Sequence, residues 1–167
     1  MSNLVYLSLG SNMGDREINL REAIAGLQAQ ARVVSVSSFY ETEPVEVTGQ
    51  AWFLNCAMSL ETAQTPQQLM RSILDTEHRM GRRRVQKKGP RVIDIDILLF
   101  DDLIVDSAEL TIPHPAMQQR RFVVEPLEEI APDARHPVLQ KTIRELLDAL
   151  PPGQKVRKIS KAITADS

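Results

Sequence analysis

Two aspartates, Asp94 and Asp96, alternate with isoleucines in an apolar segment that covers residues 92–100. Because side chains alternate between the two faces of a strand, both carboxylates would lie on one face, roughly 6.5 to 7 Å apart. Like charges placed together in an apolar strand need cations or hydrogen-bond donors as compensation. Magnesium usually binds one or two carboxylates together with water and substrate phosphates, so the pair favours a metal–nucleotide site that could hold two ions. An exposed strand face paired with nearby arginines would explain the same spacing equally well.

A cationic segment directly precedes these aspartates, because six of the ten residues from 82 to 91 are lysine or arginine. Arginine side chains bind phosphate oxygens through two parallel hydrogen bonds and stabilise the charge that develops during phosphoryl transfer. Cations next to carboxylates therefore favour a polyphosphate substrate. An ordinary solvated charge run is the alternative, and the adjoining acidic pair weakens it. Gly89 and Pro90 suggest a loop that could close over a nucleotide. Another glycine-containing segment, residues 10–15, lacks the ending of a Walker loop, and we interpret it as a turn and helix cap.

Length and composition indicate one globular domain. The chain has 167 residues, 43% of them apolar, and we assign the domain to residues 1–150 and a flexible polar tail to residues 151–167. A formal net charge of -2 argues against a general nucleic-acid-binding surface. The single cysteine, Cys56, lies in an apolar run that we expect to be core, and a lone cysteine suits a reducing compartment. We find neither a signal-peptide pattern nor a membrane-spanning run, and we expect a cytoplasmic protein.

The apolar periodicity predicts the elements that position these residues. Strands are expected at residues 4–9, 33–40, 53–61 and 92–100, a pairing segment at 103–112, and helices at 15–30, 66–80, 120–130 and 138–150. Thr65 and Pro66 mark the start of the second helix as its N-cap and first residue. Pro44 and Gly49 indicate a loop between residues 42 and 50. The order of elements predicts an α+β ferredoxin-like αβα sandwich, a mainly antiparallel sheet flanked by helices.

The segment from Gly89 to Phe100 closely resembles the signature of the 6-hydroxymethyl-7,8-dihydropterin pyrophosphokinases. Shorter matches occur throughout the chain to about residue 150: Gly10-Ser11-Asn12, residues 38–42, residues 53–55, and Pro113-His114-Pro115 followed by Arg120 and Phe122. In this family the hydroxyl of the pterin hydroxymethyl group attacks the β-phosphorus of ATP. The resemblance implies the same reaction here, with AMP and the pterin diphosphate as products for folate synthesis.

The resemblance also implies roles for individual residues. The residues expected to act in catalysis are Arg82, Arg91, Asp94 and Asp96, and the two aspartates would hold two Mg²⁺ ions. The residues expected around ATP are Glu77, Arg82, Arg84, Arg91, Ile97, Thr111, His114 and Arg120. The residues expected around the pterin are Thr42, Val45, Phe53, Asn55, Asp94 and Phe122. Within that set, Asn55 would pair with the amide edge of the pterin and the two phenylalanines would sandwich its ring. No residue is assigned as the general base.

Two departures from the family pattern concern the nucleotide. Leu74 stands where some relatives carry a polar residue, and Lys87-Lys88 replaces an arginine-tryptophan pair in a loop one residue shorter.

Two alternative functions are weighed against the pyrophosphokinase. One is an RNA-binding or regulatory ferredoxin-like domain, and the other is an ordinary kinase that moves the terminal phosphate of ATP. We expect a monomer that acts on small molecules and binds neither nucleic acid nor membranes.

Overall fold

A computed structural model describes residues 2–43, 51–81 and 92–159 of the chain. Its main sheet has six strands in the order β10-β3-β4-β1-β5, and β2 also pairs with β4. Every pairing in this sheet is antiparallel. The strands of this sheet are β1 (Asn3–Ser11), β2 (Arg32–Val36), β3 (Tyr40–Thr42), β4 (Phe53–Thr62), β5 (Asp94–Phe100) and β10 (Val156–Lys158).

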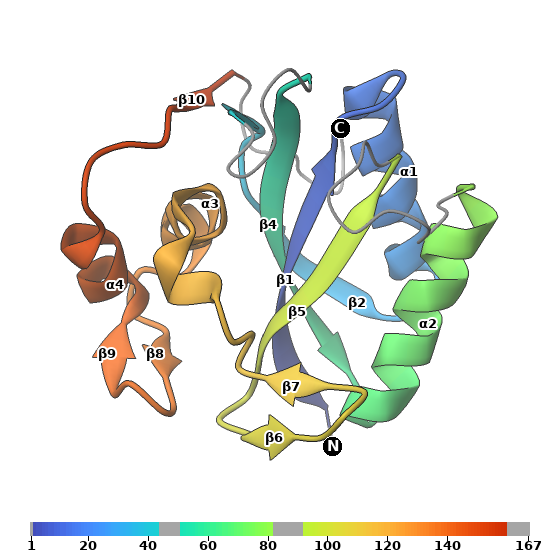
Figure 1. Ribbon diagram of the computed structural model, residues 1–167. Coiled ribbons are helices and arrows are strands. Elements are labelled where there is room, and N and C mark those ends of the chain that lie inside the picture. The colour runs from blue at the N-terminus through green and yellow to red at the C-terminus, as the bar shows by residue number, and fades with distance from the viewer. Residues whose placement is uncertain (1, 44–50, 82–91, 160–167) are drawn as a thin grey trace.

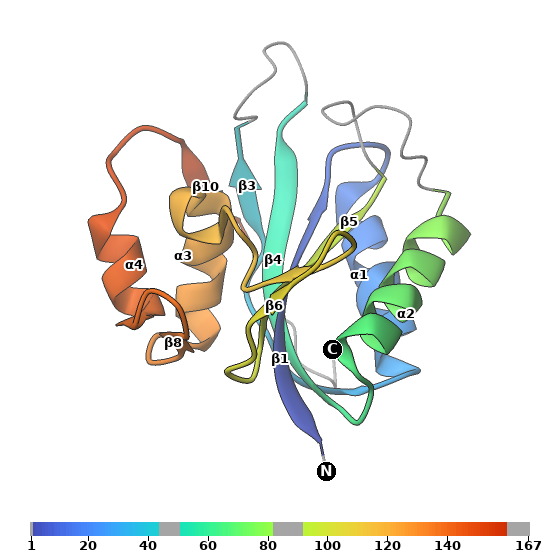
Figure 2. The same cartoon turned by 60° about the horizontal axis from the view of Figure 1, so that its bottom comes forward.

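Helices cover both faces of the sheet (Figures 1 and 2). Helices α1 (Arg16–Gln28) and α2 (Pro66–Arg79) lie on one face. On the other face α3 (Arg121–Ile130) packs against β4, and α4 (Ile143–Ala149) packs against α3. The predicted αβα sandwich with a mainly antiparallel sheet is therefore confirmed. No helix in the described ranges is long and apolar enough to cross a membrane.

Local capping interactions set the helix starts. Asp15 accepts a hydrogen bond from the Ile18 amide and caps α1, as the turn-and-cap interpretation of residues 10–15 predicted. Thr65 and Gln68 form a capping box at the start of α2, with Pro66 as its first residue, and this confirms the predicted boundary. A second capping box begins α4.

Two hydrophobic clusters pack against opposite faces of the sheet. The alternation of β1 assigns Leu7 and Leu9 to the cluster under α1 and α2, whereas Tyr6 packs against the cluster under α3 and α4. Cys56 is buried in the first cluster, as predicted. Burial raises the pKa of its thiol to about 12, which keeps it protonated and unreactive at neutral pH.

The predicted strand at residues 33–40 is divided in the structure, because residues 37–39 separate β2 from β3. The hydroxyl of Ser37 accepts a hydrogen bond from the Ala57 amide, and the Ser37 amide donates to the Ala57 carbonyl. This side-chain contact replaces one bond of the regular ladder, so β3 follows as a separate strand. The strand predicted at 92–100 is shorter and starts at Asp94.

The C-terminal third differs from the prediction in two places. The helix predicted at 138–150 begins only at Ile143, because the preceding residues form a hairpin of β8 (Arg135–His136) and β9 (Lys141–Thr142). Within that hairpin the Nδ1 atom of His136 accepts from the amides of Val138 and Leu139. Residues 156–158 were expected in a flexible tail, but they form β10 at the edge of the sheet. Another hairpin, β6 (Val105–Asp106) with β7 (Thr111–Ile112), follows β5.

We predict that Leu7→Ala lowers the free energy of unfolding by about 2–5 kcal/mol, because Leu7 is 0% exposed at the centre of the sheet. Leu4→Ala serves as the matched control on the same strand, since Leu4 is 37% exposed. Urea denaturation of both variants measures the difference. Equal losses in the two variants would contradict the position of Leu7 in the core.

Candidate functional site

One end of the sheet brings the predicted pterin and metal residues together around β1. Gly10 of β1 pairs with Asn55 of β4 on one side and with Asp94 of β5 on the other. Asp96 pairs with Ser8, two residues earlier on β1. Paired residues on neighbouring strands point to the same face, so Asn55 and the two aspartates share the face covered by α3. Two strand spacings place Asn55 roughly 10 Å from Asp94.

The two aspartates lie on one face of β5, as the sequence predicts. Both are half-buried, whereas Ile95 between them and Ile97 beyond them are buried in the core under α1 and α2. Among the described residues, no three or more side chains of histidine, cysteine, aspartate and glutamate cluster as a metal site. The donor set on β5 is therefore two carboxylates, which fits Mg²⁺ that takes its other oxygens from water and phosphates.

Asn55 is a buried polar residue whose position depends on a glycine. It is 3% exposed, and its Nδ2 atom donates a 2.6 Å hydrogen bond to the hydroxyl of Thr42 on β3. A Cβ atom added to Gly10 would lie 2.4 Å from Oδ1 of Asn55 and 3.5 Å from the ring of Phe53. The carboxamide therefore occupies the space that a side chain at position 10 would fill.

The two phenylalanines predicted to sandwich the pterin lie on the same side of the sheet. Phe53 starts β4 on the same face as Asn55, and Phe122 belongs to the first turn of α3. Both rings are half-buried, so each keeps some accessible surface. The guanidinium of Arg120 lies 5.7 Å from the centroid of the Phe122 ring, within reach of a cation–π interaction.

His114 is held against β5, the strand that carries the two carboxylates. Its amide donates to the Leu98 carbonyl of β5, and its Nδ1 atom accepts from the Ala116 amide. The neutral ring therefore carries its proton on Nε2, which is a hydrogen-bond donor. Burial and the charge of Arg120 lower the pKa of His114, and the charge of Asp94 opposes this shift.

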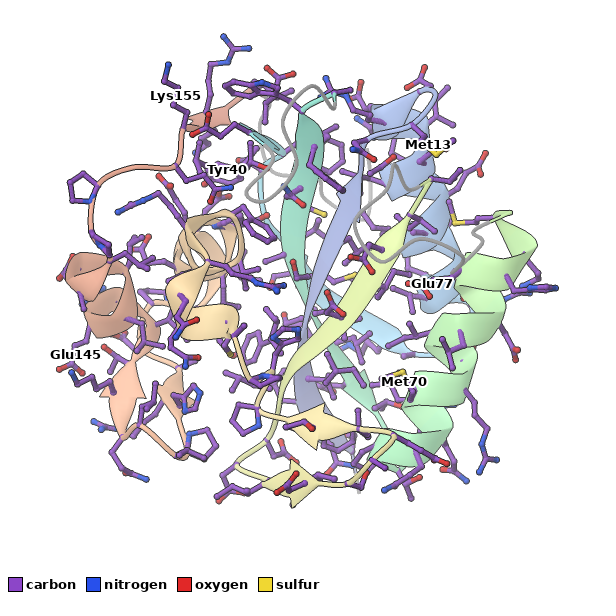
Figure 3. The ribbon with its side chains drawn as sticks, viewed as in Figure 1. Met13, Tyr40, Met70, Glu77, Glu145 and Lys155 are labelled. Carbon is purple, nitrogen blue, oxygen red and sulfur yellow. The ribbon has the colours of Figure 1, made fainter. Side chains whose placement is uncertain are left out.

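The residues predicted around adenosine lie along the outer edge of β5. Glu77 of α2 is 2% exposed, and its Oε2 atom accepts a 2.8 Å hydrogen bond from the Ile95 amide (Figure 3). That amide points away from β1, so by alternation the main chain of Ile97 also faces the outer edge. The Ile97 side chain itself is core, which leaves its main chain as the group that a ligand could meet. Thr111 is exposed on β7, beside β5.

Four predicted site residues lie outside the described residues. These are Val45, in the segment that precedes β4 in the sequence, and Arg82, Arg84 and Arg91, in the cationic segment. Lys87 and Lys88 lie in that segment too. Their predicted contacts stay predictions.

Two features of the site were missed by the sequence interpretation. Gly10 was assigned to a turn and cap, although its place in the matched Gly10-Ser11-Asn12 segment was an available signal. Glu129 of α3 accepts hydrogen bonds from the Ser38 amide and from the hydroxyl of Tyr40, which pairs with Asn55. Burial and Glu129 raise the pKa of Tyr40, so its hydroxyl stays a donor. Glu129 is 91 residues from Ser38 in the chain, so nothing local indicates this contact.

Sequence comparisons identify relatives of this chain. A model of the 7,8-dihydro-6-hydroxymethylpterin-pyrophosphokinase (HPPK) family matches residues 6–132. The 2-amino-4-hydroxy-6-hydroxymethyldihydropteridine pyrophosphokinase of Bacillus subtilis is 46% identical over 132 residues, 78% of this chain and 79% of the relative. The Folic acid synthesis protein fol1 of Schizosaccharomyces pombe is 41% identical over 152 residues, 90% of this chain and 21% of the relative. This chain thus spans about a fifth of the length of the S. pombe protein.

Solved structures share the fold. The crystal structure of Plasmodium falciparum HPPK-DHPS, wild type with pteroate, matches with a TM-score of 0.71 at 19% identity. The match covers 89% of this chain and 42% of that chain. At this identity the likeness shows the arrangement of strands and helices.

We predict that Gly10→Ala lowers the free energy of unfolding by about 1–3 kcal/mol, because the added methyl group overlaps the Asn55 carboxamide. The Asn55–Thr42 hydrogen bond should be lost, which NMR would detect as a shift of the Asn55 side-chain amide signals. Gly153→Ala is the control, since no atom lies within 4 Å of its added Cβ. An unchanged Asn55 amide in Gly10→Ala would contradict the close approach.

Proposed function

The chain belongs to the 7,8-dihydro-6-hydroxymethylpterin-pyrophosphokinase family, and we propose that it transfers the pyrophosphoryl group of ATP to 6-hydroxymethyl-7,8-dihydropterin. The observation that carries this proposal is the placement of Asn55 and the Asp94–Asp96 pair on one sheet face, on either side of Gly10. The pterin hydroxyl oxygen forms a bond to the β-phosphorus of ATP. The bond from that phosphorus to the α,β-bridging oxygen breaks, AMP leaves, and the hydroxyl proton is released.

The carboxamide of Asn55 is suited to select the pterin. A carboxamide presents a donor and an acceptor side by side, which matches the amide edge of a pterin ring. Thr42 binds one Nδ2 proton and so fixes the orientation of the group before substrate arrives. Phe53 and Phe122 offer half-buried rings on the same side of the sheet, and stacking on such rings needs no polar partner. Val45 and Asp94 complete the proposed pterin site.

Asp94 and Asp96 are the proposed magnesium ligands, with two ions bound alongside ATP. When bound, Mg²⁺ neutralises charge on the phosphate oxygens during transfer. The carboxylates lie next to the proposed pterin site, so they would hold the phosphates within reach of the hydroxymethyl group. Such positioning is a large part of catalysis in transfers of this kind.

His114 and Arg120 are proposed to bind the triphosphate. The Nε2 proton of His114 and the guanidinium of Arg120 are donors close to Asp94, where the phosphates would lie. Arg82, Arg84 and Arg91 would add cations from the segment that precedes β5. The adenosine would lie along the outer edge of β5, near Glu77, the main chain of Ile97 and Thr111.

The proposed product, a pterin diphosphate, would be used in folate biosynthesis. The name of the S. pombe relative, Folic acid synthesis protein fol1, assigns that protein to the same pathway. The comparisons lend no support to an RNA-binding or regulatory domain. The monomeric state and the cytoplasmic location expected from the sequence stay predictions.

We predict that the purified protein, incubated with ATP, Mg²⁺ and 6-hydroxymethyl-7,8-dihydropterin, forms AMP, and that Asp96→Asn slows this reaction by about 100-fold or more, because transition-state charge stabilisation is lost. Asp102→Asn is the matched control, since Asp102 is exposed in the turn after β5. Chromatography of the nucleotides measures the products. ADP in place of AMP would identify an ordinary kinase and refute the proposal.

We further predict that Asn55→Ala raises the KM for the pterin by about 10- to 100-fold, which corresponds to losing about 1–3 kcal/mol of hydrogen bonding at a buried site. The KM for ATP should stay unchanged, because Asn55 lies across β1 from the carboxylates. Asn3→Ala, at the opposite end of β1, is the control. A parallel rise of both KM values would show that Asn55 supports the whole site and does not select the pterin.

A further inference from the structure

The C-terminal strand β10 adds itself to the edge of the sheet next to the proposed pterin site. It pairs with β3, whose last residue, Thr42, accepts the hydrogen bond from Asn55. Figures 1 and 2 show the chain running from α4 to β10, and in Figure 2 β10 lies next to β3. Residues 156–158 lie beyond the range matched by the family model. We therefore asked what β10 contributes to β3 and to the proposed pterin site beside it.

Hydrogen bonds hold the β3 segment at both ends. At one end the Glu43 amide donates to the Lys155 carbonyl, and the Lys155 amide donates to the Glu43 carboxylate. The side chain of Gln154 also donates to the Glu43 carbonyl at 2.8 Å. At the other end the Ile159 amide donates to the Phe39 carbonyl. Figure 3 shows Lys155 and Tyr40 at the same edge of the molecule.

Two charged side chains of β10 contact carboxylates, one on β3 and one on α3 beside it. Arg157 forms an ion pair with Glu41, which also binds Arg16 of α1 at 2.8 Å. These hydrogen bonds, with Arg16 contributing more than Arg157, lower the pKa of Glu41. On the other face Lys158 lies 3.9 Å from Glu129, the residue that holds Ser38 and Tyr40. Exposed pairs of this kind are individually weak, so their effect depends on the strand pairing that brings them together.

Strand β3 has only three residues, so pairing with one neighbouring strand provides few main-chain hydrogen bonds to fix its position. Without β10, β3 would pair only with β4, and the groups on its other side would face solvent. Thr42 would then depend on three pairs with β4 for its position. Because Thr42 orients the Asn55 carboxamide, motion of β3 would move the group that faces the substrate.

We propose that β10 is a positioning element that holds β3, and through Thr42 the Asn55 carboxamide, in the arrangement that receives the pterin. This inference rests on the proposed function, because the pterin site is assigned there. None of the residues of β10 is expected to touch a substrate. Their effect should therefore appear in pterin binding and be absent from ATP binding, which lies on the other side of β1.

The test compares the full chain with a chain that ends at Gly153. Because a misplaced Asn55 carboxamide would form weaker hydrogen bonds with the pterin, we expect the truncated chain to show a rise of about ten-fold in the KM for the pterin, with the KM for ATP unchanged. Hydrogen exchange of the Thr42 amide and of the Asn55 side chain, followed by NMR, should become faster. A change in the thermal midpoint alone, with both KM values unchanged, would overturn the proposal.

A matched pair of proline variants separates the strand pairing from the mere presence of the tail. The Glu43 amide donates to the Lys155 carbonyl, and the Ile159 amide donates to the Phe39 carbonyl, so the main chains of Lys155 and Ile159 face β3. Because main-chain groups alternate along a strand, the Arg157 amide also points toward β3 and the Val156 amide points away from it. Arg157→Pro should therefore reproduce the truncation, whereas Val156→Pro should resemble the full chain. Arg157→Ala, which removes only the side chain, measures the contribution of the ion pair to the same KM. Identical KM values for the two proline variants would overturn the proposal.

The exchange measurement also separates this inference from the proposed function. If the full chain does not turn over ATP and pterin, the proposed function fails. Faster exchange at Thr42 and Asn55 in the truncated chain would still support the role of β10 in holding β3. If the full chain is active and exchange at Thr42 and Asn55 is the same in the truncated chain, the proposed function stays intact and the role of β10 is overturned.

Discussion

The missing side chain at Gly10 is the constraint on which the candidate site depends. Gly10 sits in the central strand between Asn55 and Asp94, and the Asn55 carboxamide fills the space where a Cβ atom would lie. A larger residue would separate the group proposed to select the pterin from its partner Thr42. The proposed pterin side and the proposed phosphate side of the site are therefore joined through one residue that contributes no side-chain chemistry itself.

One face of the sheet forms an apolar core, and the other carries the candidate site in addition to a second core. The face under α1 and α2 is apolar, and it buries the isoleucines of β5 and the leucines of β1. The opposite face carries polar residues at the end of the sheet and a second apolar cluster further along. Because strand side chains alternate, each strand contributes to both at once. The aspartates of β5 are held rigidly because the residues between and beyond them are packed into the core.

Contacts from two helices and from the edge strand β10 hold the strands that form the site. Glu77 of α2 binds the main chain of β5, Glu129 of α3 binds the turn before β3, and β10 covers the outer side of β3. Both carboxylates are at least partly buried, and both accept hydrogen bonds from main-chain amides, which offset the cost of burial. The contacts restrain two strands, β5 and β3, so a small movement of α2 or α3 would shift residues of the candidate site.

The sequence by itself determined the alternation that puts Asp94 and Asp96 on one face, the start of α2 at Thr65 and Pro66, and the family through its long match at residues 89–100. These are local properties, because a strand period, a helix cap and a motif are read from neighbouring residues. The αβα arrangement also followed, since the order of elements admits few ways to bury their apolar faces. Tertiary structure decided the place of Gly10, the contact of Glu129 with Ser38, 91 positions away, and the pairing of residues 156–158 with β3. Each depends on which distant segments lie side by side, and short polar segments such as β10 become strands only when a partner edge satisfies their main-chain hydrogen bonds.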